Sequence, residues 1–292
     1  MKRRGFLKSS LIVGGTTVVP LSLAAGTARA GGCDAAPDGF EGLEKLGRIQ
    51  PKSASQVDSS YWGIQAGAFD DDTLEKARAI GVKWSRINIH WDRVEKEKGV
   101  FDWAPYDESL DALLRYDIVP FVSLTGGNGM YTGTGTYDDP QLAAIYGDSP
   151  LPPLDEKGKA GWINYVTTAV NRYRDRIRHW EVWNEPNHRN YWGAPPDGHA
   201  YGELVRYTVD LILELHPGAK IIAGSMAGIS ADFTDKFLSR CDPKKNDVIS
   251  FHNYGNRPEN RVYAIEDFKN VLDRYNPDFE IWQGECGIAS TS

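Results

Sequence analysis

The chain has 292 residues, of which 33 are lysine or arginine and 40 are aspartate or glutamate, giving a formal net charge of −7 at pH 7. This acidic balance lacks the basic surface that nucleic-acid binding requires, and it suits a neutral substrate better than a polyanion. Cys33, Cys241 and Cys286 are too few for a disulfide framework, and the sequence contains neither a CxxC motif nor a histidine cluster with metal-ligand spacing. We therefore expect no nucleic-acid partner, no metal and no cofactor.

Residues 1–30 have the features of a secretory signal. A basic start, MKRR, precedes a modest apolar run, and ARA at 28–30 supplies a small-x-small cleavage site. The stretch RRGFLK resembles a twin-arginine export signal, with an ordinary basic start as the alternative. The apolar run is too short and too interrupted to span a membrane. We predict export to the periplasm or beyond, a linker over 31–58 and a folded domain over 59–292.

From residue 61 onward, short apolar runs alternate with amphipathic stretches. Alternating or continuous apolar runs predict strands at 61–67, 82–91, 118–124, 177–183, 220–225, 247–255 and 279–285. Helical periodicity and end signals predict helices at 70–81, 106–117, 161–175, 200–217, 231–240 and 262–275. This regular alternation is typical of a parallel α/β protein.

The length of the folded part favours a closed barrel over an open sheet. A (β/α)8 barrel typically needs about 250 residues, close to the length of 59–292. An open doubly wound sheet is the alternative, but IQAGAFDDD after the first strand is not a glycine-rich phosphate turn. Only seven strands are predicted, and the chain stops soon after the seventh. We therefore expect a TIM barrel whose eighth strand and helix are missing.

Polar residues gather where four of the predicted strands end. A barrel carries its functional groups at the carboxyl ends of its strands, so residues distant in sequence meet in one mouth. The residues concerned are Arg86, Asn88, Asn184, Glu185, His252, Tyr254 and Glu285. These side chains form the predicted site.

Glu185 and Glu285 are the candidate catalytic pair. Each ends an apolar strand beside tryptophan, in EVWNE and EIWQGE. Glycoside cleavage needs one carboxyl group that is protonated to assist the leaving oxygen and a second that is ionised. Pro186 disfavours helical backbone at the preceding residue, so we expect Glu185 in extended geometry, projecting into the cleft. Arg86 would keep the other carboxylate ionised.

The motif WNEPN at 183–187 resembles the acid/base motif of the clan A glycoside hydrolases, which are retaining enzymes built on the (β/α)8 barrel. In that clan an Asn-Glu pair ends strand four and the nucleophilic glutamate ends strand seven, and the strand count here agrees. Family 39, the β-xylosidase and α-iduronidase group, is most similar. The resemblance implies Glu185 as acid/base, Glu285 as nucleophile, Asn184 on the sugar 2-hydroxyl and Arg86 near the nucleophile.

The resemblance also covers SFHNYG, where His252 and Tyr254 match residues near the nucleophile or substrate. For His252, a purely structural role is the alternative. A retaining glycosidase acting on a neutral poly- or oligosaccharide is the leading functional hypothesis. The alternatives are an inactive, carbohydrate-binding barrel remnant and, less favoured, a nucleotide-using α/β enzyme. The sequence leaves the sugar, the linkage and the oligomeric state open.

Overall fold

The computed structural model describes four stretches of the chain: residues 61–65, 69–135, 149–254 and 262–287. They all belong to one unit, Pro51–Ser292. The predicted signal and linker, and Cys33 with them, lie outside the described residues. Export and the division into signal, linker and domain therefore stay predictions.

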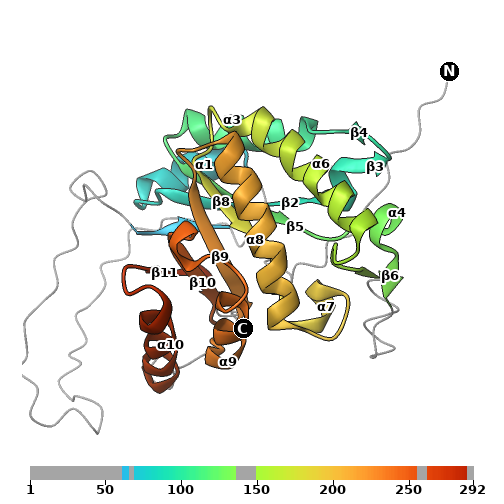
Figure 1. The fold of residues 1–292 in the computed structure, drawn as a ribbon. Coiled ribbons are helices and arrows are strands. Elements are labelled where there is room, and N and C mark those ends of the chain that lie inside the picture. Colours follow the sequence, from blue (N-terminus) through green and yellow to red (C-terminus); the bar gives the residue numbers. More distant parts are fainter. Residues whose placement is uncertain (1–60, 66–68, 136–148, 255–261, 288–292) are drawn as a thin grey trace, which may run out of the picture. The chain divides into compact units, whose positions relative to one another are not determined.

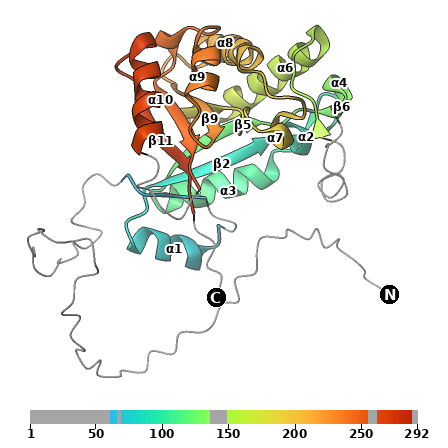
Figure 2. The same ribbon diagram turned by 90° about the horizontal axis from the view of Figure 1, so that it is seen from below.

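Seven strands form one curled sheet (Figures 1 and 2). Neighbours in the sheet are parallel throughout, in the order β1-β2-β5-β8-β9-β10-β11. Their bounds are β1 (Gly63–Ile64), β2 (Trp84–His90), β5 (Val119–Thr125), β8 (His179–Val182), β9 (Lys220–Ala227), β10 (Val248–His252) and β11 (Glu280–Glu285). Seven parallel strands in a curled sheet, alternating with helices, confirm the predicted α/β fold of the barrel type.

Six longer helices alternate with these strands, each close to its predicted position: α1 (Asp71–Ala79), α3 (Ala104–Arg115), α6 (Glu156–Tyr173), α8 (Gly198–Leu215), α9 (Ala231–Leu238) and α10 (Val262–Tyr275). Capping side chains set several starts. Helix α6 begins five residues before its predicted start, because Asp155 accepts a hydrogen bond from the Gly158 amide and caps the helix there. None of the described helices is both long enough and apolar enough to cross a membrane.

Several elements are too short to leave a periodic signal in the sequence. After β2 the chain forms α2 (Trp91–Val94) and a hairpin of β3 (Glu95–Glu97) and β4 (Val100–Phe101). Buried Glu95 holds this segment by accepting hydrogen bonds from the Trp91 indole at 2.6 Å and the Gly99 amide at 2.7 Å. The other short elements are α4 (Gly129–Thr132), β6 (Thr134–Gly135), β7 (Ser149–Pro150), α7 (Arg189–Trp192) and the 3₁₀ turn η2 (Pro243–Lys245).

The inner face of the curled sheet carries two layers of different chemistry. Successive strand residues face opposite sides, so Ile87 and Ile89 pack into the main core with the helices. The opposite, inner face starts with an apolar layer that comprises Trp84, Phe121, Ile222, Val248 and Trp282. The same face turns polar at Arg86, Ser123 and Ser250, each two residues beyond a member of this layer, and at Glu181 on β8; each of the four is at most 2% exposed. The site is built on this polar layer.

His179 lies against the apolar layer, with ring centroids 5.0 Å from Trp84 and 5.9 Å from Trp282. Burial, assisted by the charges of Lys220 and Arg178, lowers the pKa of His179 from 6.5 to about 4. Between these two values the unfolded chain binds a proton that the folded chain does not. His179 therefore makes the protein less stable as the pH falls through this window.

We expect the variant His179→Phe to lose less of its thermal stability than the wild type when the pH falls from 6.5 to 4. Phenylalanine preserves the ring packing and removes Nδ1, which has no hydrogen-bond partner among the described residues. Thermal unfolding followed by circular dichroism across this range provides the measurement. Trp282→Phe is the control, because it alters the same layer and keeps the histidine. Equal pH dependence in wild type and His179→Phe would contradict the prediction.

Candidate active site

The structure brings six of the seven predicted site residues together at the carboxyl ends of the strands. Asn184 and Glu185 follow β8, His252 is the last residue of β10, Tyr254 lies two residues later, and Glu285 is the last residue of β11. Arg86 differs from the prediction in depth, because it is the third residue of β2 rather than its end. It lies beneath the mouth, 2% exposed, and reaches up to the others.

Arg86 is the centre of the hydrogen-bond network. Its Nε donates to Glu181 Oε2 at 2.7 Å, and its Nη1 donates to Glu285 Oε1. Its Nη2 donates to Asn184 Oδ1 and to Ser225 Oγ, each at 2.9 Å. One buried cation therefore holds residues of β8, β9 and β11 and the segment after β8 in fixed relative positions.

Glu181 is a buried partner that the sequence reasoning missed. Its side chain is fully buried in β8, accepts from Arg86 through Oε2 and accepts from the Ser250 hydroxyl through Oε1 at 2.7 Å. A signal was available: in HWEVW a glutamate stands between Trp180 and Val182, which both face the core. A buried arginine needs a carboxylate partner, and Glu181 occupies the inward position that supplies one.

Asn88 was also expected in the mouth, but no hydrogen bond among the described residues joins it to this network. Its Oδ1 is buried and has no hydrogen-bond partner among the described residues. Its register partner in β5 is Ser123, whose hydroxyl donates to the Trp183 carbonyl at 2.8 Å. Asn88 therefore faces the interior without joining the Arg86 network.

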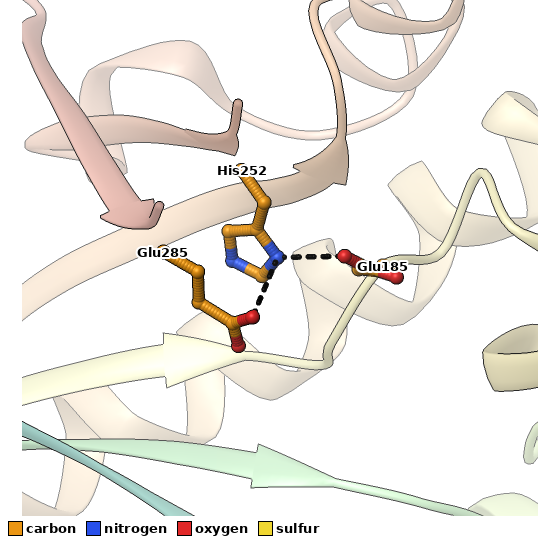
Figure 3. A group of neighbouring side chains, drawn as sticks. All are labelled: Glu185, His252 and Glu285. Atoms are coloured by element: carbon orange, nitrogen blue, oxygen red, sulfur yellow. Dashed lines mark hydrogen bonds and ion pairs between the residues drawn. The ribbon is translucent and has the colours of Figure 1, made fainter. Parts of the chain in front are cut away.

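The two candidate carboxylates approach one another across His252 (Figure 3). His252 Nδ1 lies 3.0 Å from Glu185 Oε1 and 3.7 Å from Glu285 Oε2. One atom from each of the three residues lies within 4.8 Å of the other two. The distance between the two catalytic carboxyl groups differs between the two classes of glycosidase. A separation of about 5–5.5 Å allows direct nucleophilic attack, whereas about 6.5–9.5 Å leaves room for an attacking water. Here a carboxylate oxygen of Glu185 lies within 4.8 Å of one of Glu285, closer to the first spacing than to the second.

The backbone at Glu185 differs from the expected extended geometry. Strand β8 ends at Val182, and both Trp183 and Glu185 have positive φ, 69° and 46°. The prediction that Pro186 holds Glu185 extended was wrong. The Glu185 amide donates to the Ser225 carbonyl at 2.8 Å, and this bond to the neighbouring strand outweighs the local preference before proline. Uncommon backbone conformations of this kind concentrate at functional sites.

Tyr254 supplies a second donor to Glu285. Its hydroxyl donates to Oε2 at 2.8 Å, while Arg86 occupies Oε1. Partial burial, together with the neighbouring Glu285 carboxylate, raises the pKa of Tyr254 well above its ordinary value. The phenol therefore keeps its proton and remains a donor at neutral pH.

Glu185, His252 and Glu285 could together approach a metal ion, since each offers a ligand atom within 4.8 Å of the others. The surrounding contacts oppose that use. Both oxygens of Glu285 already accept hydrogen bonds, from Arg86 and from Tyr254. A cation bound there would compete with a guanidinium whose charge repels it. The arrangement fits acid–base and nucleophilic chemistry better than metal binding.

Comparison with solved structures adds independent information about the fold. The chain resembles a family 39 glycoside hydrolase from Xanthomonas axonopodis pv. citri, with a TM-score of 0.61 at 21% sequence identity. It also resembles a monomeric β-xylosidase from Caulobacter crescentus CB15, with a TM-score of 0.62 at 20% identity. The chain has the fold of the family 39 glycoside hydrolases. The matched regions cover 79% of this chain and 51% and 52% of those structures.

Sequence comparison points to related proteins. A β-xylosidase from Geobacillus stearothermophilus is 23% identical over 166 residues, which is 54% of this chain and 31% of that protein. A 6-phospho-β-glucosidase from Clostridium longisporum is 30% identical over 132 residues, 41% of this chain and 23% of that protein. The chain thus spans less than a third of these curated relatives and about half of the solved structures. No known family profile matches the sequence.

We expect Glu181→Gln to lower the free energy of unfolding by roughly 3 kcal/mol, because removing one partner of a buried ion pair leaves the other uncompensated. Glu203→Gln is the matched control: its side chain is 48% exposed and pairs with Arg206 on the surface. Loss of that pair should cost less than about 1 kcal/mol. Urea denaturation of the two variants gives both values, and equal losses would show that the Arg86–Glu181 pair contributes no more than a surface pair.

Proposed function

We propose that this chain carries the active site of a retaining O-glycoside hydrolase, in which Glu185 is the acid/base and Glu285 the nucleophile. The observation that supports this most directly is the close approach of the two carboxylates around His252, within 4.8 Å. Each comes from a different strand end, and each has different hydrogen-bond partners. Two carboxylates in unequal surroundings can take the two roles that double displacement requires.

Glu285 suits the nucleophile because both of its oxygens are held by donors. Arg86 balances its charge and fixes Oε1, while the Tyr254 phenol fixes Oε2. A carboxylate oriented in this way can attack an anomeric carbon with little rearrangement. The covalent glycosyl intermediate that results is released in a second step by water.

Glu185 suits the acid/base because a single hydrogen bond holds it and its side chain reaches the opening, 11% exposed. It would protonate the leaving oxygen in the first step and take a proton from the attacking water in the second. Among the described residues, Oε2 accepts no hydrogen bond and points away from the imidazole (Figure 3). That oxygen is the one placed to exchange a proton with the substrate.

Asn184 suits substrate binding. Arg86 donates to its Oδ1 at 2.9 Å, which orients the amide because only the oxygen can accept. The amide NH₂ group must therefore face another direction, where it can donate to a sugar hydroxyl. This agrees with the 2-hydroxyl contact that the clan A resemblance implies.

The substrate that best fits is a neutral β-linked poly- or oligosaccharide. The formal charge of −7 disfavours polyanions. Several of the similar proteins are β-xylosidases by name, one of them from Caulobacter crescentus and one from Geobacillus stearothermophilus. We therefore propose aryl β-xylosides as the first compounds to assay, ahead of glucosides, galactosides and mannosides.

We expect Glu185→Gln and Glu285→Gln each to lower turnover of these aryl glycosides by at least about 10²-fold, the scale of losing a positioned acid–base group. Glu280→Gln is the matched control, since Glu280 lies in the same strand at its opposite end and pairs with Lys220. It should turn over substrate like the wild type. Unchanged turnover in either active-site variant would remove that residue from the mechanism.

The stereochemical outcome tests the two-step route separately. Proton NMR of the first product should show the anomeric configuration of the substrate, because two displacements restore it. Inversion would contradict the role of Glu285 as nucleophile. If the folded wild-type chain binds xylo-oligosaccharides but hydrolyses none of the aryl glycosides, the protein is an inactive carbohydrate-binding barrel.

A further inference from the structure

Ser225 connects the Arg86 network to His252. Its hydroxyl oxygen lies 2.9 Å from Arg86 Nη2 and 3.2 Å from His252 Nε2, and the residue is fully buried. The opposite ring nitrogen, Nδ1, lies 3.0 Å from Glu185 Oε1. A continuous chain of hydrogen bonds therefore runs from the guanidinium through a serine and an imidazole to the proposed acid/base.

The donors in this chain can be assigned by counting protons. A guanidinium only donates, so Ser225 Oγ accepts from Arg86. The serine also has one proton of its own, and a buried hydroxyl proton needs an acceptor. Among the described residues, the other polar atom in hydrogen-bond contact with Ser225 Oγ is His252 Nε2. Ser225 therefore donates to Nε2, and Nε2 accepts.

If Nε2 accepts, a neutral imidazole carries its proton on Nδ1. We propose that Ser225 is a positioning residue that sets the Nδ1–H tautomer of His252, and that His252 in turn occupies Glu185 Oε1 and confines the catalytic proton to Oε2. The tautomer follows from the hydrogen-bond network alone. Its catalytic consequence rests on the function proposed above.

The backbone is shaped to bring Ser225 into this place. In the pairing of β9 with β10, Ala223 aligns with Ile249 and Met226 aligns with Phe251, so β9 has one extra residue at this point. This bulge contains Gly224 and Ser225, with φ of 96° and 45°. A Cβ at residue 224 would meet the Ser250 carbonyl at 2.6 Å. Bulges re-aim side chains, and this one turns Ser225 toward Arg86 and His252.

The proposed arrangement gives each oxygen of Glu185 one task. When the glycosidic bond breaks, its electron pair stays on the leaving oxygen, which takes the proton from Oε2, while an oxygen of Glu285 bonds to the anomeric carbon. Throughout this step Oε1 keeps its hydrogen bond from Nδ1–H. A proton on Oε1 would instead face the hydrogen on Nδ1, so the two groups would repel and make no hydrogen bond. That proton would also lie away from the substrate.

The tautomer can be measured without any substrate. Nitrogen-15 NMR of the imidazoles, with His252→Gln to assign the signals, should show Nδ1 of His252 as protonated and Nε2 as unprotonated. In Ser225→Ala and Ser225→Gly the protonated signal should move, wholly or in part, to Nε2. Two serine variants are used because glycine tolerates positive φ. Ser123→Ala, which removes a buried hydroxyl that contacts the Trp183 carbonyl instead, should leave His252 unchanged.

A His252 that carries its proton on Nε2 in the wild type would overturn the proposal, and so would an unchanged tautomer in both Ser225 variants. Neither outcome depends on glycosidase activity, so failure here is distinct from failure of the proposed function.

Activity gives a second readout. Substrates with poor leaving groups need the acid, so Ser225→Gly should lose about tenfold in kcat/KM on a disaccharide and under about twofold on an activated aryl glycoside. Equal losses on both would show that Ser225 does not act through the catalytic proton.

Discussion

The buried charge of Arg86 is the constraint on which the rest of the site depends. A guanidinium that is 2% exposed must have each of its donors satisfied, since an unpaired buried cation costs several kcal/mol. The chain meets this requirement with groups from β8, β9 and β11 and from Asn184 beyond β8. By bonding to all of these groups, Arg86 holds together strand ends that lie far apart in the sequence. It also fixes the position of the proposed nucleophile.

Positioning these partners of Arg86 requires uncommon backbone conformations. Trp183, Glu185 and Ser225 all have positive φ, although none is glycine. Such conformations cost about 1–3 kcal/mol each and persist where surrounding contacts over-determine them. Here the amide of Glu185 bonds to the carbonyl of Ser225, so the two irregular segments support each other. The apolar layer beneath, with Trp84 and Trp282 in edge contact, gives them a rigid base.

The order of strands and helices could be predicted because hydrophobic periodicity is local, and the structure confirms all seven strands and six helices. Glu185 and Glu285 could be found because each lies at or just beyond the end of a strand, in WNEPN and in EIWQGE. Ser225 and Ser250 were missed for a physical reason: a single polar residue within an apolar strand does not reveal its partner. Glu181 did leave a signal, because its alternation with the core residues Trp180 and Val182 places it on the inner face. The bulge at Gly224 depends on pairing between strands, which local pattern does not contain. A non-local bond, from the Glu185 amide to the Ser225 carbonyl, likewise overrode the effect of Pro186 on Glu185.

The two proposed catalytic glutamates illustrate how one residue type acquires two roles. Glu285 has donors on both oxygens, one of them a cation, so both oxygens are held in position. Among the described residues, one side chain contacts the Glu185 carboxyl group, the His252 imidazole, whose far nitrogen contacts Ser225; in the proposed tautomer this imidazole is the donor. The first arrangement favours a carboxylate that attacks, and the second favours a carboxyl group that gains and loses a proton. Because Arg86 contacts both Glu285 and Ser225, a single buried residue orients one glutamate directly and the other through two intermediates. On the proposed assignment, the buried hydrogen-bond network itself distinguishes the nucleophile from the acid/base before any substrate binds.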